Sequence, residues 1–172
     1  MGFWHDMRHK RQIYERDAAR PVSMARILLA DGTSANLLYR AMRWSARRRL
    51  RGLAYACQFA NKLINHCVIG VDAEFGPGFV LLHPTGVVIN SKVKGGRNVA
   101  LESGVVIGDD KGRSPVLGDD VFVGSGAKVI GGVEVGSGAR IGANAVVVKP
   151  VEPDTTVVGI PARPVARRRE GP

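Results

Sequence analysis

The chain has 172 residues, a formal net charge of +10, only 6% aromatic residues and 22 glycines. No stretch approaches the roughly 20 apolar residues of a membrane span, and the first 20 residues are polar and charged, so neither a span nor a secretory signal is indicated. Its two cysteines, Cys57 and Cys67, lack metal-ligand spacing and are expected to be buried thiols. This length allows one domain-sized core with a smaller helical unit beside it.

The positive charge is concentrated in the first third of the chain. Residues 1–66 contain 13 Lys or Arg against 4 Asp or Glu, whereas residues 67–172 contain 12 against 11. A basic region can attract nucleic acid, an anionic membrane or an anionic small molecule. The run Arg47–Arg51 could lie on a membrane surface or pack its apolar side on a partner helix, and we favour packing. We expect no nucleic-acid binding.

Apolar residues recur at helical spacing through residues 6–60, with arginines between them. A break is expected at residues 31–34, where Thr33 or Ser34 would cap the next helix. That helix is predicted to run from about Leu37 to Ile64.

A six-residue repeat dominates the second half of the chain. Its aliphatic positions are Leu117, Val123, Val129, Val135, Ile141 and Val147, and glycine follows most of them. Such a period is the mark of a β-helix built from hexapeptide repeats, in which each unit supplies one short strand and one inward side chain. A β-sandwich would instead show strands every 8–12 residues or so. The sequence therefore predicts a mainly β protein: a parallel β-helix at 67–165, a small α-helical N-terminal region at 1–66 and a flexible tail at 166–172.

The repeat is interrupted between Phe75 and Ile89, where two extra residues are inserted in a stretch that contains His83. In solenoid proteins, insertions gather on the functional face. A single histidine is more often a satisfied residue at the edge of a core than a catalytic base. Here the insertion favours the catalytic interpretation.

A second interruption adds four residues between Ile107 and Leu117, and it predicts a protruding loop at 109–114. Between these interruptions, Gly95 occupies an inward position that an aliphatic residue should fill. The repeat offers no explanation for that glycine.

Several segments resemble the serine acetyltransferases of the hexapeptide acyltransferase superfamily. Residues 75–78 and 83–89 are similar to the motif that carries that family's catalytic histidine, 157–165 to the closing motif of hexapeptide transferases, and 13–17 to the family's N-terminal segment. The resemblance covers residues 10–165. It implies a left-handed β-helix, an exception to the right-handed rule for crossovers. It also implies a homotrimer with acetyl-CoA bound between adjacent subunits.

The resemblance assigns roles to particular residues. His83 matches the general base that takes the acceptor's hydroxyl proton, and Asp17 matches an aspartate that holds the substrate amine. Arg113 matches an arginine that pairs with the substrate carboxylate, a contact that suits the guanidinium fork, and Ser114 follows it at a second substrate-binding position.

Three positions depart from the family pattern. Leu82 stands where the family has an acidic residue, Ser114 replaces a histidine, and Val68 replaces the aspartate that orients the base. Asp72 is close to that last position in sequence but is out of register with it. These changes leave the residue that orients His83 open, and they put serine itself in question as the acceptor.

For acetyl-CoA, the resemblance points to small residues on adjacent coils and to two basic residues that could meet the phosphates. They are Ser125, Gly126, Ala127, Ala143, Lys149 and Arg163. Solvent-facing charges at the coil ends are an equal alternative for the last two. A zinc enzyme of the γ-carbonic-anhydrase kind resembles this fold, but none of the four histidines lies beyond residue 83, so no metal is expected.

The sequence thus predicts a cytoplasmic, acetyl-CoA-dependent O-acetyltransferase of the serine type, acting in cysteine biosynthesis. The first alternative is a sugar or polysaccharide O-acetyltransferase of the same fold. The second is a non-catalytic trimeric scaffold, with peripheral membrane contact through its basic helices. The terminal sequence predicts no stable complex with a cysteine synthase, because a terminal proline cannot replace the isoleucine that such complexes use.

Overall fold

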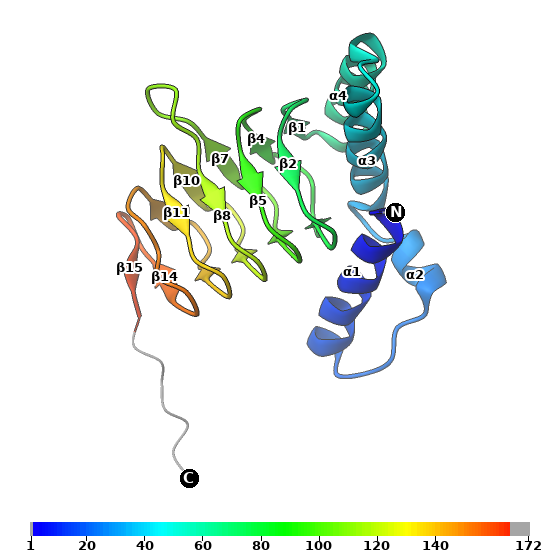
Figure 1. Cartoon of the computed structure of the whole chain (residues 1–172). Helices are drawn as coiled ribbons and strands as arrows, with labels where there is room; N and C mark the ends of the chain where they lie inside the picture. The colour runs from blue at the N-terminus through cyan, green and yellow to red at the C-terminus, as the bar shows by residue number, and fades with distance from the viewer. Residues whose placement is uncertain (1, 166–172) are drawn as a thin grey trace.

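The computed structural model describes residues 2–165, and it consists of a helical region followed by a parallel β-helix (Figure 1). The expectations for the tail at 166–172 lie outside the described residues. Within residues 2–165, no helix is both long enough and apolar enough to span a membrane.

Four helices form the first region. They are α1 (Phe3–Ala18), α2 (Met24–Leu28), α3 (Thr33–Arg47) and α4 (Arg51–Asn65). Figure 1 shows α3 and α4 lying side by side at one end of the β-helix, with α1 and α2 below them. The α1 and α3 helices both contact strand β3 (Val80–Leu81), so the helical region packs against the first coil.

The single helix expected from Leu37 to Ile64 is wrong, because the chain turns back between α3 and α4. Arg49 adopts a left-handed conformation with φ of 61°. The Leu50 N–H then donates to the Ser45 carbonyl at 2.9 Å and closes the turn. The arginines in this turn favour helix by propensity, and the turn forms because α4 packs back on α3.

The expected cap of α3 is also wrong. The N-cap is Gly32, at φ of 77°, and it has no side chain to offer. Thr33 Oγ1 instead donates to the Ile27 carbonyl at 2.7 Å, and Ser34 Oγ donates to Asn65 Oδ1 at 2.6 Å. A Cβ on Gly32 would lie 2.0 Å from the Leu81 carbonyl oxygen, so glycine lets this loop lie against the first coil.

The β-helix has three parallel sheets, and each of the first four coils contributes a strand to each sheet in turn. The first sheet contains β1 (Val68–Ile69), β4 (Val88–Ile89), β7 (Val106–Gly108), β10 (Lys128–Ile130) and β13 (Val146–Val147). The second contains β2 (Glu74–Phe75), β5 (Lys94–Gly95), β8 (Val116–Leu117) and β11 (Glu134–Val135). The third contains β3, β6 (Ala100–Leu101), β9 (Phe122–Val123), β12 (Arg140–Ile141), β14 (Thr156–Val158) and β15 (Arg163–Pro164), the last pairing antiparallel.

The second residue of most strands points into one continuous core that runs the length of the β-helix. Among the parallel strands Gly95 is the exception, and the structure explains it. A Cβ at Gly95 would lie 2.2 Å from the ring of Phe75, its partner on the neighbouring strand. Phe75 stacks on Phe79 with ring centroids 4.1 Å apart, so these rings fill the space that a side chain at residue 95 would occupy.

Polar side chains from the helices satisfy the exposed edge of the first coil. Asn36 donates to the Phe79 carbonyl at 2.8 Å and accepts from the Leu81 N–H at 3.0 Å, as a neighbouring strand would. Gln58 donates in the same way to the Ile69 carbonyl at 2.8 Å. An uncovered strand edge exposes unpaired backbone groups, so the helical region acts as the cap of this end of the β-helix.

Candidate active site

His83 lies at the corner that follows β3, where the extra residues interrupt the repeat. It lines a cavity of about 390 Å³ between the second half of α1 and the third sheet. The lining residues are Ile13, Tyr14, Asp17, Ala18, Leu82, His83 and Glu102. The fold therefore brings His83 and Asp17, two of the residues expected from the sequence, to the same cavity.

A carboxylate contacts the imidazole of His83. Asp31 Oδ2 lies 3.0 Å from His83 Nδ1, and both side chains are more than half exposed, at 57% and 54%. Asp31 belongs to the loop between α2 and α3 rather than to the β-helix. In the sequence, Asp31 stands out only as part of an expected helix break.

The other candidates for orienting His83 are engaged elsewhere. Asp72 pairs with Arg51, whose guanidinium lowers the pKa of that carboxyl group through a hydrogen bond. Val68 belongs to β1, on a different sheet from β3. Neither residue lines the His83 cavity.

The position beside His83 is apolar because it packs the helical region onto the coil. Leu82 is 4% exposed and clusters with Ile13, Val80 and Ala100. Tyr14 packs on the same cluster, and burial raises the pKa of its phenol, with the charges of Asp31 and Glu102 acting in the same direction. Among the described residues, the cavity wall thus holds two carboxylates, Asp17 and Glu102, and no lysine or arginine.

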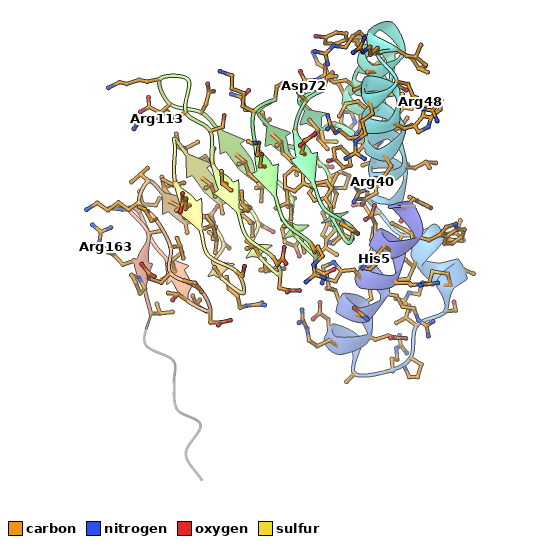
Figure 2. The ribbon with its side chains drawn as sticks, viewed as in Figure 1. His5, Arg40, Arg48, Asp72, Arg113 and Arg163 are labelled. Atoms are coloured by element: carbon orange, nitrogen blue, oxygen red, sulfur yellow. The ribbon has the colours of Figure 1, made fainter. Side chains whose placement is uncertain are left out.

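Arg113 lies outside this cavity. It sits in a tight hairpin between β7 and β8, where Asp110 and Arg113 exchange two backbone hydrogen bonds of 3.0 Å. Figure 2 shows Arg113 on the loop that projects from the β-helix. Next to it, Ser114 Oγ is buried without a hydrogen-bond partner among the described residues. Within one subunit, the structure does not bring Arg113 to His83.

The small residues expected at the acetyl-CoA site lie on stacked turns of successive coils. The Gly126 N–H donates to the Ser103 carbonyl at 2.7 Å, and the Asn144 N–H donates to the Ser125 carbonyl at 2.8 Å. Ala143 is exposed, whereas the methyl group of Ala127 points into the core. Ala127 could therefore contact a ligand only through its backbone.

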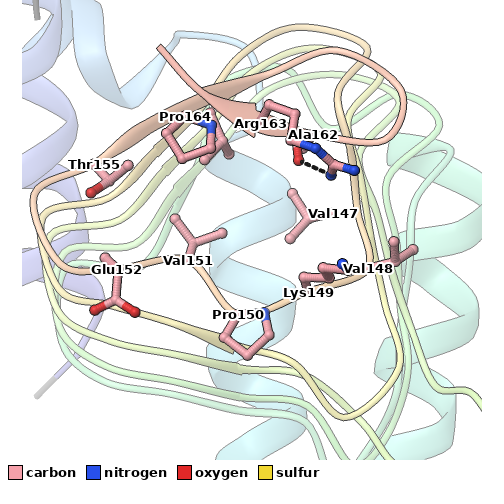
Figure 3. Close-up of a pocket in the computed structure, with 11 residues that line it drawn as sticks. Val147, Val148, Lys149, Pro150, Val151, Glu152, Thr155, Ala162, Arg163 and Pro164 are labelled. Atoms are coloured by element: carbon pink, nitrogen blue, oxygen red, sulfur yellow. Dashed lines mark hydrogen bonds between the residues drawn. The ribbon is translucent and has the colours of Figure 1, made fainter. Parts of the chain in front are cut away.

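Lys149 and Arg163 line a second cavity, of about 310 Å³, at the end of the β-helix far from the helices (Figure 3). Its wall also contains Val147, Val151 and Pro164. Arg163 Nη1 donates to the Ala162 carbonyl at 2.9 Å, a bond drawn in Figure 3. The structure thus places Lys149 and Arg163, both expected from the sequence to bind phosphate, around one opening.

No metal site is seen in the part of the chain that the structure describes, and of the two free cysteines only Cys67 is the buried thiol expected from the sequence, because Cys57 is half-buried. Across residues 2–165, no group of three or more His, Cys, Asp or Glu side chains could hold a metal ion. Cys67 is fully buried, and burial raises the pKa of its thiol to about 12.

Comparisons with known proteins define the class. The sequence model described as bacterial transferase hexapeptide (six repeats) matches residues 114–149, which lie within the β-helix. The serine acetyltransferase of Mycobacterium tuberculosis is 36% identical over 162 residues, covering 92% of this chain and 71% of that protein. The chain belongs to the serine acetyltransferase family.

Solved structures of that family share the fold. Soybean serine acetyltransferase complexed with serine aligns with a TM-score of 0.84 and 34% identity, covering 95% of this chain and 68% of that one. A serine acetyltransferase in complex with CoA aligns with a TM-score of 0.83 and 31% identity, covering 94% and 67%. The fold is therefore the left-handed β-helix expected from the resemblance. This chain spans about two thirds of the length of these two proteins.

Proposed function

We propose that this protein is an acetyl-CoA-dependent serine O-acetyltransferase with His83 as its general base. The observation that carries the proposal is the position of His83, on the wall of a cavity and in contact with a carboxylate at Nδ1. Family membership supports the chemistry, because the relatives are serine acetyltransferases and one was solved with CoA.

The proposed step is direct transfer. His83 takes the proton of the acceptor hydroxyl as its oxygen forms a bond to the thioester carbonyl carbon. The C–S bond then breaks, and the proton passes from His83 to the departing CoA sulfur. A cysteine-linked acetyl intermediate is disfavoured because neither Cys57 nor Cys67 lines the His83 cavity.

The electrostatics of the cavity favour an amino-acid acceptor over a sugar. Asp17 and Glu102 would attract an ammonium group, and no lysine or arginine of the same subunit lines the wall. A neutral sugar hydroxyl would gain nothing from these charges. The loss of acidic and histidine side chains at Leu82 and Ser114 still favours the sugar alternative, so the acceptor must be measured.

The carboxylate of serine needs a cationic partner, and we assign that role to Arg113 of a neighbouring subunit. The hairpin that carries Arg113 lies outside the His83 cavity of its own subunit, so a complete site requires a second copy. This supports a homotrimer with acetyl-CoA between subunits. Lys149 and Arg163 would meet the CoA phosphates near the far cavity. The scaffold alternative assigns no role to the His83 cavity.

The cytoplasmic location and the absence of a cysteine synthase complex stay predictions. Titration calorimetry tests the second with the full chain and a purified cysteine synthase. We expect no heat of binding. A dissociation constant below 1 μM, equivalent to more than about 8 kcal/mol, would contradict it.

The central experiment measures CoA release with serine and with a panel of sugars. We expect activity with serine, and a fall in kcat of about 10²–10⁴-fold in His83→Ala, the usual contribution of a general base. The matched control is His5→Ala, because His5 is exposed on α1 and lies outside the cavity. Full activity in a folded His83→Ala trimer would refute the assignment.

A second variant tests the acceptor. Arg113→Lys keeps the charge but loses the guanidinium fork, so the KM for serine should rise while the KM for acetyl-CoA stays unchanged. Arg8→Lys, at an exposed position of α1, is the control. Unchanged serine kinetics in Arg113→Lys, or transfer to sugars alone, would leave the sugar acetyltransferase as the better function.

A further inference from the structure

The loop between α2 and α3 supplies a residue that acts on the proposed base. We propose that Asp31 is the positioning residue of His83 and that the buried Lys10 holds Asp31 in place. This inference rests on the proposed function of His83. It assigns to the helical region the orienting role that the resemblance places at position 68, where Val68 has no polar group to hold the imidazole.

The contact fixes the form of the imidazole. An ionised carboxylate oxygen can only accept, so at 3.0 Å Asp31 Oδ2 holds the proton on His83 Nδ1. Nε2 is then the nitrogen with the free lone pair, which is the form a general base requires. The same carboxylate stabilises the imidazolium that forms when His83 takes a proton, as the aspartate does in a Ser-His-Asp triad.

Lys10 acts as a clamp between the loop that carries Asp31 and the strand that leads to His83. Its ammonium group is fully buried and donates to the Asp31 carbonyl, to Thr33 Oγ1 at 3.3 Å and to the Leu81 carbonyl at 3.3 Å. These acceptors satisfy its three N–H groups. Leu81 lies two residues before His83, so one cation joins the loop of Asp31 to the strand that leads to the base.

The loop that carries Asp31 packs closely on β3, and it cannot move away from that strand without breaking the hydrogen bonds of Lys10. Gly32 follows Asp31, and its Cα lies so close to the Leu81 carbonyl that any Cβ would clash. Burial lowers the pKa of Lys10 to about 8, while the negative charge of Asp31 opposes that fall. The Lys10 clamp is therefore a buried, hydrogen-bonded contact that joins α1, the Asp31 loop and β3.

A structural role and a positioning role predict different results. The side chains of Asp31 and His83 are both more than half exposed, and such pairs add little to stability. Asp31→Asn and Asp31→Ala should therefore fold and melt like the wild type. Their kcat should fall by about 10–100-fold, part of the contribution of a general base, with an unchanged KM for acetyl-CoA.

The matched control is Asp72→Asn, which breaks an equally exposed pair with Arg51 outside the cavity and should leave kcat unchanged. Lys10→Met should lower kcat through the loss of the clamp, and adding Asp31→Ala to it should lower kcat little further, because both act on one contact. Wild-type kcat in both Asp31 variants would overturn the proposal. So would a kcat loss in Asp31→Ala matched by an equal loss of folded protein.

The nitrogen NMR shifts of the His83 ring decide the question independently of any activity. The chain has four histidines, so His83 is assigned by comparison with His83→Ala. We expect the Nδ1-protonated tautomer in the neutral ring of the wild type and a mixture in Asp31→Ala. A wild-type ring protonated mainly at Nε2 would overturn the proposal. An inactive wild type with the expected tautomer would refute the serine acetyltransferase function and leave the pairing intact.

Discussion

The two regions of this molecule are held together by different means. The β-helix repeats one solution: a short parallel strand, an inward aliphatic side chain and a turn, coil after coil. The helical region meets the first coil through contacts that occur once each, made by buried polar side chains such as Asp6, Lys10 and Asn36. Because the coils repeat, the loss of one inward side chain removes one of many similar contacts. Each contact between the helical region and the first coil, called a docking contact below, occurs only once. The proposed catalytic base lies where the two regions meet.

The two ends of the β-helix show the same contrast. At the far end, β15 turns back and pairs antiparallel with β14, so backbone satisfies backbone. At the near end, side chains satisfy the edge: Tyr39 Oη contacts both the Ala73 carbonyl and the Phe75 N–H. Such a cap needs specific residues at specific positions, and it can carry side chains such as Asp31 into the site.

The largest expected effect comes from breaking the docking contact of Asp6. Its carboxylate is fully buried and accepts two hydrogen bonds of 2.7 Å from Arg40 and one of 2.9 Å from the Gly78 N–H. Asp6→Ala leaves the guanidinium, which is 18% exposed, without its carboxylate, although Arg40 still donates to the Phe75 and Gly76 carbonyls. We expect a loss of about 3–5 kcal/mol in the free energy of unfolding, measured by urea denaturation at fixed protein concentration.

The control for that experiment is Asp72→Ala. Asp72 also pairs with an arginine, but both side chains are 53% exposed. Its midpoint should stay within error of the wild type. If the two variants lost the same stability, the helical region would not depend on its buried polar contacts.

The second prediction concerns a unique position inside the repeat. At Gly95 a methyl group would lie 2.2 Å from the Phe75 ring. Gly95→Ala should therefore cost about 1–3 kcal/mol, as overpacking of a core does. Combining it with Phe75→Leu should cost less than the sum of the two single changes, because the smaller side chain gives back the space. A neutral Gly95→Ala in thermal unfolding would contradict the packing.

These positions show what the sequence could and could not predict. The coils followed from the six-residue period, because the inward residue of each strand must be apolar. The extra residues around His83 followed from the same arithmetic. Gly95 could not be explained, since its size is complementary to Phe75 on another coil. Asp31 could not be found, because its contact with His83 spans 52 residues and depends on how the helices dock.

The break between α3 and α4 was missed for a related reason. Arg47, Arg48 and Arg49 all favour helix, so the turn itself contains no stop signal, and the nearby Gly52 lies inside α4. The turn forms through the packing of α4 on α3. Periodic features were thus predictable, and contacts made once were not.

The third prediction is a pH dependence of stability that arises from Lys10, a residue of the docking contacts. The pKa of Lys10 is about 8 in the folded chain and near 10.5 when exposed, so from pH 8 to 10.5 the unfolded chain binds one more proton. Stability should therefore rise with pH in that window, by about 1 kcal/mol between pH 8 and 9. Cys67 acts in the opposite direction above pH 9, because its folded pKa is about 12.

The test compares urea midpoints of the wild type, Lys10→Met and Cys67→Ala between pH 7.5 and about 10.5. The Lys10→Met variant should lack the rise, since the methionine that replaces Lys10 has no proton to lose. Cys67→Ala should keep the rise and extend it above pH 9, where the wild type flattens. Identical pH profiles for the wild type and Lys10→Met would show that the buried ammonium group does not lose its proton in this range.

The smallest expected effect is a deviation from additivity, and it compares the two regions directly. Ile89 on the first sheet and Ile141 on the third sheet point into the core two coils apart, and both are at most 1% exposed. Successive coils are separated by about 4.8 Å, so the two side chains are too distant to share a cavity. Ile→Val at each should cost about 0.5–1.5 kcal/mol, and the double variant should equal the sum within about 0.5 kcal/mol. In the docking region, Lys10→Met and Asn36→Ala both act on Leu81, through its carbonyl and its N–H, and should couple by more than that. Coupling between the two isoleucine changes would show that the coils are not independent. Additivity of Lys10→Met and Asn36→Ala would show that the docking contacts are independent of each other.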